Sequence, residues 1–311
     1  MGIRKFLKDN LPSDIVDPLR RVYGDIHYAA MHVVPEEWYL KRRFKKLVGY
    51  PLNLDNPQTF NEKLQWLKLH DRNPLYTKMV DKYEAKKYVA DIIGEEYIIP
   101  TLGVWDNFDE IDFDKLPNQF VLKCTHDSGS IVICKDKATF DKKAARKKLE
   151  RGLRYNYYYS GGFEWAYKNV KPRIIAETYL YNDEEKGLTD YKFYCFKGKA
   201  KFLYVSEGLG GEHSLAYMNF FDLDWNLTPY QRDDFMQFPY KPTKPCRFNR
   251  MIDLADKIAN NVEAKFARID LYEVNSRIYF SECTFFPGEG ATPFSPNSWE
   301  EKIGTLLELD K

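Results

Sequence analysis

Four residues near the carboxyl end of this 311-residue sequence have the types and spacing needed for metal and phosphate chemistry: Arg268, Asp270, Glu282 and Thr284. Side chains two apart on a strand share a face. If the stretches that carry them pair as a hairpin, one sheet face presents a guanidinium, two carboxylates and a hydroxyl. Opposed like charges are unfavourable unless a cation lies between them. With the Pro-Gly-Glu-Gly loop that follows, the set suits Mg²⁺ held against nucleotide phosphates, although charges on an arbitrary hairpin are more often only solvated.

The stretches that carry these residues are predicted to be antiparallel strands. Residues 266–271 and 277–280 are rich in β-branched and aromatic side chains. Between them, Asn275 and Ser276 are turn formers, so a turn is expected at 273–277. An amphipathic helix at 253–263 leads into this hairpin.

A second hairpin is predicted from strands at 120–124 and 131–134. Its tip contains Gly129 and Ser130, and its backbone N–H groups are free to lie over phosphates. Lys123 at the end of the first strand would meet a phosphate as a point charge. His126 is a candidate catalytic residue if the loop reaches the γ-phosphate, although a loop histidine more often only makes hydrogen bonds. Many hairpins have polar tips, so this feature indicates phosphate binding only together with others.

The elements that must position these groups are predicted from periodicity and capping. Residues 1–71 are expected to be mostly helical, with a capping box where Thr59 precedes Glu62. Further helices are expected at 78–93 and 137–155, and further strands at 174–180, 190–196 and 201–205. We find no internal repeat.

Several loops and faces could complete a site. Asp190, Lys192 and Tyr194 share one face of their strand. The aromatic, glycine-containing loop at 157–162 is a candidate lid. Candidates for lining an acceptor pocket are Arg154, Glu212 and His213.

Composition indicates an ordinary soluble protein. Hydrophobic residues make up 44%, charged residues 30%, and the net charge is +1, so nucleic acid is not expected as a partner. The 23 Tyr and 21 Phe favour ring-lined surfaces that accept sugars or bases. The five cysteines include no Cys-x-x-Cys pair and are expected to be reduced thiols of a cytoplasmic protein.

The sequence contains no apolar run of membrane-spanning length and no signal-peptide core. A basic cluster comprises Lys41, Arg42, Arg43, Lys45 and Lys46. A solvated helix face is the more ordinary interpretation of this cluster. The alternative is a contact with an acidic substrate or with anionic lipid at the inner face of the plasma membrane.

The order of these features resembles the ATP-grasp superfamily, which includes D-alanine ligases and carboxylate-amine ligases. The closer resemblance, from about residue 38 onward, is to the TupA-like (teichuronopeptide-biosynthesis type) ATP-grasp proteins of bacterial surface-polysaccharide loci. The motifs that carry it are Asn56 to Lys63, Asp81-Lys82 with Lys86, Lys123 with Gly129-Ser130, Glu177-Thr178-Tyr179-Leu180, Asp190-Tyr191-Lys192-Phe193, Phe220 to Trp225, Arg268-x-Asp270 and Glu282-x-Thr284.

This resemblance implies an α+β, ATP-grasp fold in which two mixed α/β lobes clasp ATP. The implied parts are an N-terminal helical region at 1–70, a small lobe at 71–176 with the phosphate-covering loop, and a large lobe at 177–311 with the hinge and metal site. The sequence lacks a recognisable Rossmann-like domain ahead of the lobes, which leaves the usual acceptor-binding arrangement in question.

The resemblance also implies residue roles. Phosphate contacts would come from Lys82, Lys123, Gly129 and Ser130, and the adenine edge would be read by Glu177, Thr178, Tyr179 and Leu180. Asp190 would hold the ribose hydroxyls, and Lys192 would follow the polyphosphate. Asp270 and Glu282 would hold Mg²⁺, and Arg268 would neutralise the transferred phosphoryl group. Thr284 stands where Asn is usual as the third metal-side ligand.

The implied reaction is ATP-dependent ligation of a carboxylate to an amine through an acyl phosphate. The implied substrates are a uronic-acid-containing glycan or nucleotide sugar and an amino acid or other amine. A kinase on the same fold would stop after phosphorylating a glycan hydroxyl. A metal-dependent glycosyltransferase is the further alternative, because Asp222-Leu223-Asp224 has the Asp-x-Asp form, although a turn before Trp225 is the more ordinary interpretation. A non-catalytic glycan-binding module would leave the carboxylates without a purpose.

Overall fold

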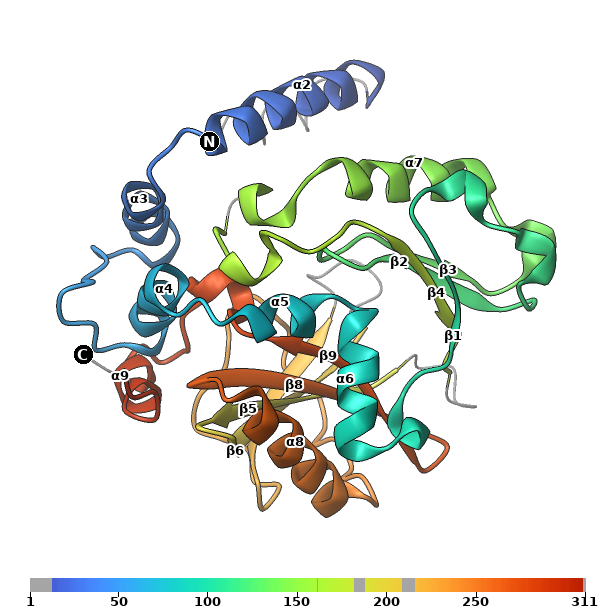
Figure 1. The fold of residues 1–311 in the computed structure, drawn as a ribbon. Helices are drawn as coiled ribbons and strands as arrows, with labels where there is room; N and C mark the ends of the chain where they lie inside the picture. The colour runs from blue at the N-terminus through green and yellow to red at the C-terminus, as the bar shows by residue number, and fades with distance from the viewer. Residues whose placement is uncertain (1–12, 161, 182–187, 209–215, 310–311) are drawn as a thin grey trace.

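The computed structural model describes residues 13–160, 162–181, 188–208 and 216–309, which form helices and two antiparallel sheets (Figure 1). The helices are α2 (Ser13–Met31), α3 (Glu36–Val48), α4 (Phe60–His70), α5 (Pro74–Val80), α6 (Glu84–Ile93), α7 (Lys142–Arg154), α8 (Phe248–Val262) and α9 (Ser298–Gly304). The strands are β1 (Thr101–Trp105), β2 (Phe120–Cys124), β3 (Ile131–Cys134), β4 (Ile174–Thr178), β5 (Asp190–Phe196), β6 (Lys199–Glu207), β7 (Tyr217–Asp222), β8 (Phe266–Val274) and β9 (Arg277–Thr284).

The smaller sheet has the strand order β1-β4-β2-β3 and is covered on one face by α7 (Figure 1). Asp141 caps α7 by accepting a hydrogen bond from the N–H of Ala144. Buried Leu149 of α7 belongs to one apolar cluster with Phe120 and Leu122 of β2. The alternation of a strand therefore turns Lys123 toward the opposite face.

The larger sheet has the order β7-β6-β5-β8-β9, and α8 covers one of its faces. Seven buried residues line the inner side of α8: Phe248, Met251, Leu254, Ala255, Ile258, Ala259 and Val262. They belong to the same apolar core as Phe193 of β5 and Ile269 of β8, which alternate with the charged residues of their strands. The charged residues accordingly lie on the other face of this sheet.

That other face is divided into an aromatic part and a charged part. Near α4, the rings of Phe60, Tyr194, Phe202, Phe266 and Phe294 pack against one another. The capping box that positions α4 is present as predicted. The remainder of the face carries the charged side chains and faces the smaller sheet.

Both predicted hairpins are confirmed. β2 and β3 have the predicted bounds, and β8 and β9 are joined by a two-residue turn in which Asn275 (φ 50°) and Ser276 (φ 59°) adopt the left-handed conformation. Arg268 lies opposite Thr284, and Asp270 lies opposite Glu282.

The helix predicted at 78–93 is instead two helices, α5 and α6. Between them, buried Asp81 accepts a hydrogen bond from the N–H of Tyr83 (2.9 Å) and pairs with Arg173 (2.7 Å). An Asp side chain that bonds its own backbone in this way competes with a continuous helix. The break places Lys82 beside the β2–β3 loop, where its N–H donates to the carbonyl of Thr125 (3.0 Å).

The lobe ranges 71–176 and 177–311 stay a prediction, and two observations describe the packing near their limits. Residues of α5 and α6, including Tyr76, Met79 and Val89, are buried in the core of the larger sheet. Glu177 and Thr178 end β4 and belong to the smaller sheet.

The candidate lid at 157–162 is anchored at two points. Tyr158 and Phe163 are buried in one cluster with Met31, Leu40 and Phe44 of the N-terminal helices. Gly161, Glu212 and His213 lie outside the described residues.

Among the described residues, no helix is both long and apolar enough to cross a membrane. All five cysteines are free, and four of them are buried, in agreement with the expectation of unpaired thiols.

Candidate active site

Asp270 lies at the centre of a buried charge cluster on β8. Arg268 Nε lies 2.7 Å from Asp270 Oδ1, and Arg268 Nη2 lies 2.7 Å from Oδ2. Lys192, directly opposite on β5, donates to Oδ2 at 2.5 Å. Arg268 Nη2 also donates to the Thr284 hydroxyl (3.0 Å) and lies 3.4 Å from Glu282 Oε1. The cation that two opposed carboxylates require is therefore supplied by the protein itself.

Asp190 belongs to the same cluster. Its Oδ1 lies 2.9 Å from Lys192 Nζ, and both residues are buried. The predicted contact of Asp190 with ribose hydroxyls stays a prediction, since its carboxylate is engaged by Lys192 in this structure.

Of the two carboxylates predicted to hold the metal, Glu282 is the more accessible, with 39% of its side chain exposed, whereas Asp270 is fully buried. Burial opposes ionisation of Glu282, but Lys192, Arg268 and Lys82 outweigh it and hold its pKa at about 2. Burial raises the pKa of Asp270, and Arg268 and Lys192 oppose that shift. Glu282 therefore stays ionised and can offer its oxygens to a cation.

The donor chemistry fits Mg²⁺, which prefers oxygen and is often held by one or two carboxylates plus substrate phosphates. Asp270 and Glu282 supply the carboxylates. Thr284 adds a hydroxyl, although Arg268 already donates to it. Within the described part of the chain, no group of three or more His, Cys, Asp or Glu side chains is arranged to hold a metal. A metal here would need further oxygens, such as those of a phosphate.

On the smaller sheet, Glu177 is held by two lysines. Lys123 Nζ lies 2.6 Å from its Oε2, and Lys86 pairs with its Oε1. Lys86 also donates to the carbonyl of Ile99 (2.5 Å). Burial disfavours the charge of Glu177, but Lys123 and Lys86 lower its pKa to about 2. The motif Asp81-Lys82 with Lys86 contains both lysines, but only Lys82 was predicted as a site residue, because the spacing alone does not show which lysine faces β4.

The segment Thr178, Tyr179 and Leu180 follows Glu177 directly and is half-buried. Tyr179 stacks on Tyr181, with ring centroids 5.8 Å apart. Its predicted contact with adenine stays a prediction.

The β2–β3 loop is fixed by three side chains. Lys82 Nζ donates to the carbonyl of Asp127, and the Ser130 hydroxyl donates to the Asp127 carboxylate. Gly129 has φ 99°, and the position of a side chain there is open space, so the tip can approach a ligand closely. The role of Gly129 and Ser130 at the tip of a phosphate-covering loop stays a prediction.

His126 of this loop is buried and directed toward the end of α7. Its Nε2 lies 3.1 Å from the carbonyl of Gly152 and 3.3 Å from that of Tyr155. Burial lowers its pKa, which favours the neutral ring. These contacts make His126 an anchor of the loop, and its catalytic role stays a prediction. Arg154, a candidate for the acceptor pocket, is exposed at the end of the same helix.

The two sheets meet at these charges. Burial opposes the charge of Lys123, but Glu177 of its own sheet and Tyr272 and Glu282 of the larger sheet raise its pKa. Lys82 likewise contributes to the low pKa of Glu282. Lysines on one side therefore face carboxylates on the other, as a binding site for a metal-bound polyphosphate requires.

Two further buried ionisable residues, Lys68 and Glu164, were not predicted as site residues from the sequence. Buried Lys68 of α4 donates to the carbonyls of Gly162 and Glu289, both at 2.7 Å. Burial lowers the pKa of Lys68 to about 8 and raises that of nearby Glu164 to about 7. These residues come from three distant segments, and only the Pro-Gly-Glu-Gly loop around Glu289 gave a signal in the sequence.

The Asp-x-Asp motif forms a turn. Asp222 Oδ1 accepts hydrogen bonds from the N–H groups of Asp224 (3.0 Å) and Asn226 (2.7 Å). Trp225, between them, has φ 71°. The interpretation of Asp222-Leu223-Asp224 as a turn before Trp225 is thus supported. The motif follows β7, which lies at the edge of the larger sheet farthest from Glu282 on β9.

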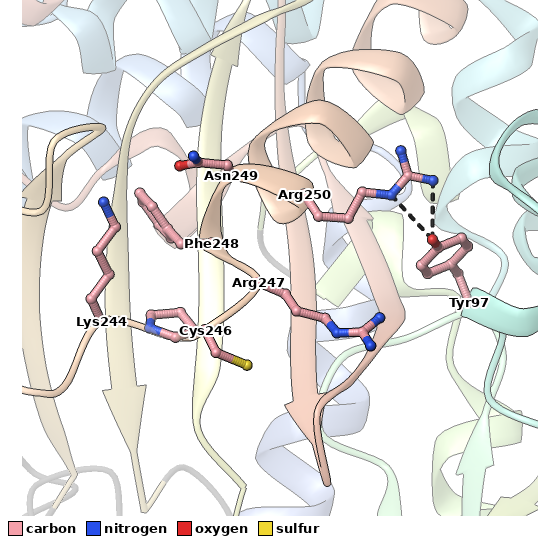
Figure 2. A pocket seen from close by; sticks show the side chains of 8 residues that line it. Tyr97, Lys244, Cys246, Arg247, Phe248, Asn249 and Arg250 are labelled. Atoms are coloured by element: carbon pink, nitrogen blue, oxygen red, sulfur yellow. Dashed lines mark hydrogen bonds between the residues drawn. The ribbon is translucent and has the colours of Figure 1, made fainter.

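A pocket of about 650 Å³ lies elsewhere, at the start of α8 (Figure 2). Its lining includes Lys244, Arg247 and Arg250, and Arg250 donates to the hydroxyl of Tyr97 through Nε (3.1 Å) and Nη2 (3.0 Å). None of the predicted site residues lines it.

A family model described as TupA-like ATPgrasp matches residues 62–308. The chain belongs to the TupA-like ATP-grasp family. The family and the ATP-grasp fold predicted from the sequence are therefore confirmed. No curated protein sequence matches this TupA-like chain.

Several solved structures are similar to this TupA-like protein. D-alanine–D-alanine ligase from Helicobacter pylori is 16% identical, with 80% of this chain and 69% of that chain covered and a TM-score of 0.44. D-alanyl-alanine synthetase A from Vibrio cholerae O1 is 12% identical (74% and 62% covered, TM-score 0.42). D-alanine–D-alanine ligase from Bacillus anthracis, complexed with ATP, is 14% identical (67% and 54% covered, TM-score 0.38). The chain thus spans between 54% and 69% of the length of these proteins.

Proposed function

We propose that this TupA-like protein is an ATP-dependent ligase that activates a carboxylate as an acyl phosphate and joins it to an amine. The observation that supports this most strongly is the buried cluster of Arg268, Lys192, Asp270 and Glu282, which faces Lys123 of the smaller sheet. Ionised carboxylates and fixed cations on opposite walls suit a polyphosphate with its metal.

Each part of the cluster has a role in this reaction. Asp270 and Glu282 would hold Mg²⁺, which neutralises phosphate charge and orients the transferred group. Lys82 and Lys123 bind phosphate oxygens in place of their present partners. Arg268, held by both oxygens of Asp270, offsets the charge that builds up on the transferred phosphoryl group.

The reaction then needs no nucleophile from the protein. An oxygen of the substrate carboxylate forms a bond to the γ-phosphorus while the bond to ADP breaks. The amine nitrogen next attacks the carbonyl carbon, and phosphate leaves as the amide forms. The protein's contribution is to hold the groups in line and to exclude water.

The substrates belong to the same proposal. We expect a uronic-acid-containing glycan or nucleotide sugar and an amino acid or other amine, as the family resemblance implies. A kinase would use the same cluster and would form ADP with a glycan hydroxyl and no amine. The glycosyltransferase alternative loses support, because the Asp222 carboxylate is occupied in its own turn.

A peripheral membrane contact at the inner face of the plasma membrane also stays a proposal. Apolar side chains of α2, α3 and the turn between them are exposed, among them Ile26, Val33 and Trp38. Exposed basic residues, including Lys45 and Lys46 of α3, lie close to them in the sequence. Apolar side chains beside basic ones suit an anionic bilayer surface.

Isothermal titration with a non-hydrolysable ATP analogue and Mg²⁺ tests the proposed function. Glu282→Gln and Asp270→Asn should each weaken binding by about tenfold or more, because each removes a charge-assisted contact. Asp222→Asn is the matched control and should bind like the wild type. Absence of ATP-analogue binding, together with binding of UDP-sugars and Mn²⁺ that Asp222→Asn abolishes, would overturn the proposal in favour of a glycosyltransferase.

A further inference from the structure

The pocket at the start of α8 is lined by cations (Figure 2). Its volume of about 650 Å³ is within the range of roughly 300–1,000 Å³ that small-molecule sites occupy. Three of its lining residues, Lys244, Arg247 and Arg250, are positively charged, and none of the described residues that line it is Asp or Glu. The closest carboxylate contact is that of Glu273, which accepts a hydrogen bond from the thiol of Cys246 (3.1 Å). Positive charge is therefore in excess at this pocket.

None of the three cations is paired with a carboxylate of the described residues. Arg247 is exposed, and no hydrogen bond, ion pair or ring contact reaches its guanidinium from the described residues. Arg250 donates to the Tyr97 hydroxyl, through Nε (3.1 Å) and Nη2 (3.0 Å). A cleft lined by charges of one sign concentrates ions of the opposite sign, so this pocket attracts an anion.

Two aromatic rings hold the outer members of the cationic set in place. The ammonium of Lys244 lies 4.9 Å from the ring centroid of Phe248, which is buried in the core of the larger sheet. The guanidinium of Arg250 lies 5.3 Å from the ring centroid of Tyr97. Figure 2 shows Arg247 and Arg250 extending toward the side of Tyr97, with Lys244 beside Phe248. Lys244 and Arg250 are thus held before a ligand arrives, and Arg247 is free to turn toward it.

The backbone adds donors at the same place. Arg247 precedes the first residue of α8 and makes no side-chain cap. The N–H groups of Asn249 and Arg250 donate to no acceptor among the described residues. Unpaired N–H groups in the first turn of a helix favour an anion with several oxygens, and here they add to a cavity that already carries three cations.

We propose that this pocket binds the phosphoryl group of a soluble ligand, at a second site separate from the ATP cluster. The charges favour phosphate over a carboxylate, because a phosphate monoester carries about −1.5 to −2 charges at pH 7 and three acceptor oxygens. Arg247 would bind two of these oxygens through its forked donors, and Lys244 would act as a point charge. α8 covers one face of the larger sheet and the cluster around Asp270 lies on the other, so binding here does not depend on the proposed ligase function.

Cys246 provides a readout at the pocket itself. It lines the pocket and is exposed, whereas the other four cysteines are buried. The test uses the full chain, with its ATP site saturated by the non-hydrolysable analogue and Mg²⁺. Alkylation of Cys246 by iodoacetamide is followed by mass spectrometry in the presence of inorganic phosphate, of glucose 1-phosphate, or of sodium acetate at equal ionic strength.

Bound phosphate should shield the thiol. Inorganic phosphate or glucose 1-phosphate should slow alkylation by up to about tenfold at ten times its Kd, and acetate should leave the rate unchanged. A stronger effect of glucose 1-phosphate would identify a sugar phosphate as the ligand class. Equal effects of the two probes would identify the phosphoryl group alone as what the pocket recognises.

Arg247→Gln is the decisive variant, because the Arg247 side chain makes no contact with the described residues whose loss could unfold the protein. It should weaken phosphate binding by about tenfold or more, the loss expected for charge-assisted hydrogen bonds. Arg151→Gln, at an exposed arginine of α7, is the matched control and should keep the protection seen in the wild type. Wild-type alkylation unaffected by both phosphates, equal protection by acetate, or full protection in Arg247→Gln would each overturn the inference.

Discussion

Removing the charge of Glu177 is expected to destabilise the protein at neutral pH and to make its stability less sensitive to acid. Glu177 is 3% exposed and pairs with Lys123 at 2.6 Å and with Lys86. Burial opposes its ionisation, but the two lysines hold its pKa at about 2, against 4.5 for an ordinary glutamate. This difference corresponds to roughly 3 kcal/mol of folding free energy at pH 7.

Glu177→Gln removes that contribution and leaves two lysines without a counter-charge. A carboxylate with a lowered folded-state pKa contributes stability that is complete above the unfolded pKa of 4.5 and is lost as the pH falls toward 2. We therefore expect the free energies of unfolding of wild type and variant to differ by about 3 kcal/mol at pH 7 and by about 2 kcal/mol at pH 3.5.

Urea unfolding followed by circular dichroism at the two pH values measures both differences. Glu150→Gln is the matched control, because Glu150 forms an exposed pair with Arg146 at 3.1 Å and exposed pairs contribute little. A loss in Glu177→Gln no larger than that of the control, or a difference from wild type that does not shrink at pH 3.5, would refute the reasoning.

Three further predictions concern residues outside this pair. His126→Ala should lower the free energy of unfolding by about 1–3 kcal/mol, because the carbonyls at the end of α7 lose their donor. The same substitution should lower kcat less than tenfold, and a decrease in kcat of about a hundredfold or more would support the predicted catalytic role. Asp222→Asn should lower the free energy of unfolding measured by calorimetry by about 1 kcal/mol and leave binding of the ATP analogue unchanged. Loss of ATP-analogue binding in this variant would show that β7 reaches the site. The protein should co-sediment with vesicles rich in phosphatidylglycerol at low salt, and the double substitution Val33→Ser and Trp38→Ser should reduce the fraction of protein bound. Equal binding to neutral vesicles would contradict the electrostatic part of this contact.

Local patterns allowed the hairpins and their charged face to be predicted. The alternation of Arg268 and Asp270, with turn formers at Asn275 and Ser276, is complete within a short stretch of sequence, so register and facing follow from it. The capping box at Thr59 is local in the same sense. These are the features whose physical causes lie within a few residues.

Features that depend on distant segments were missed. The Asp81 side chain that interrupts the helix between α5 and α6 is also held by Arg173, which lies far along the chain. The partners of Lys68 come from loops around residues 162 and 289, and none of the local patterns joins them. The anchoring contacts of His126 could not be predicted either, because its sequence neighbours place it in a polar loop, whereas the end of α7 buries it.

The two ion pairs that join α5 and α6 to the smaller sheet lie at opposite ends of β4. Asp81 holds Arg173 just before the strand, and Lys86 holds Glu177 near its end. Both helices pack on the core of the larger sheet, so these two ion pairs attach β4 to that core at both ends of the strand. Any swing of the smaller sheet would then turn about β4, and β3, at the free edge, would travel farthest. The β2–β3 loop is tied to the same α5–α6 connection, since Lys82 donates to the carbonyls of Thr125 and Asp127, so the loop could follow such a swing only after these two bonds break.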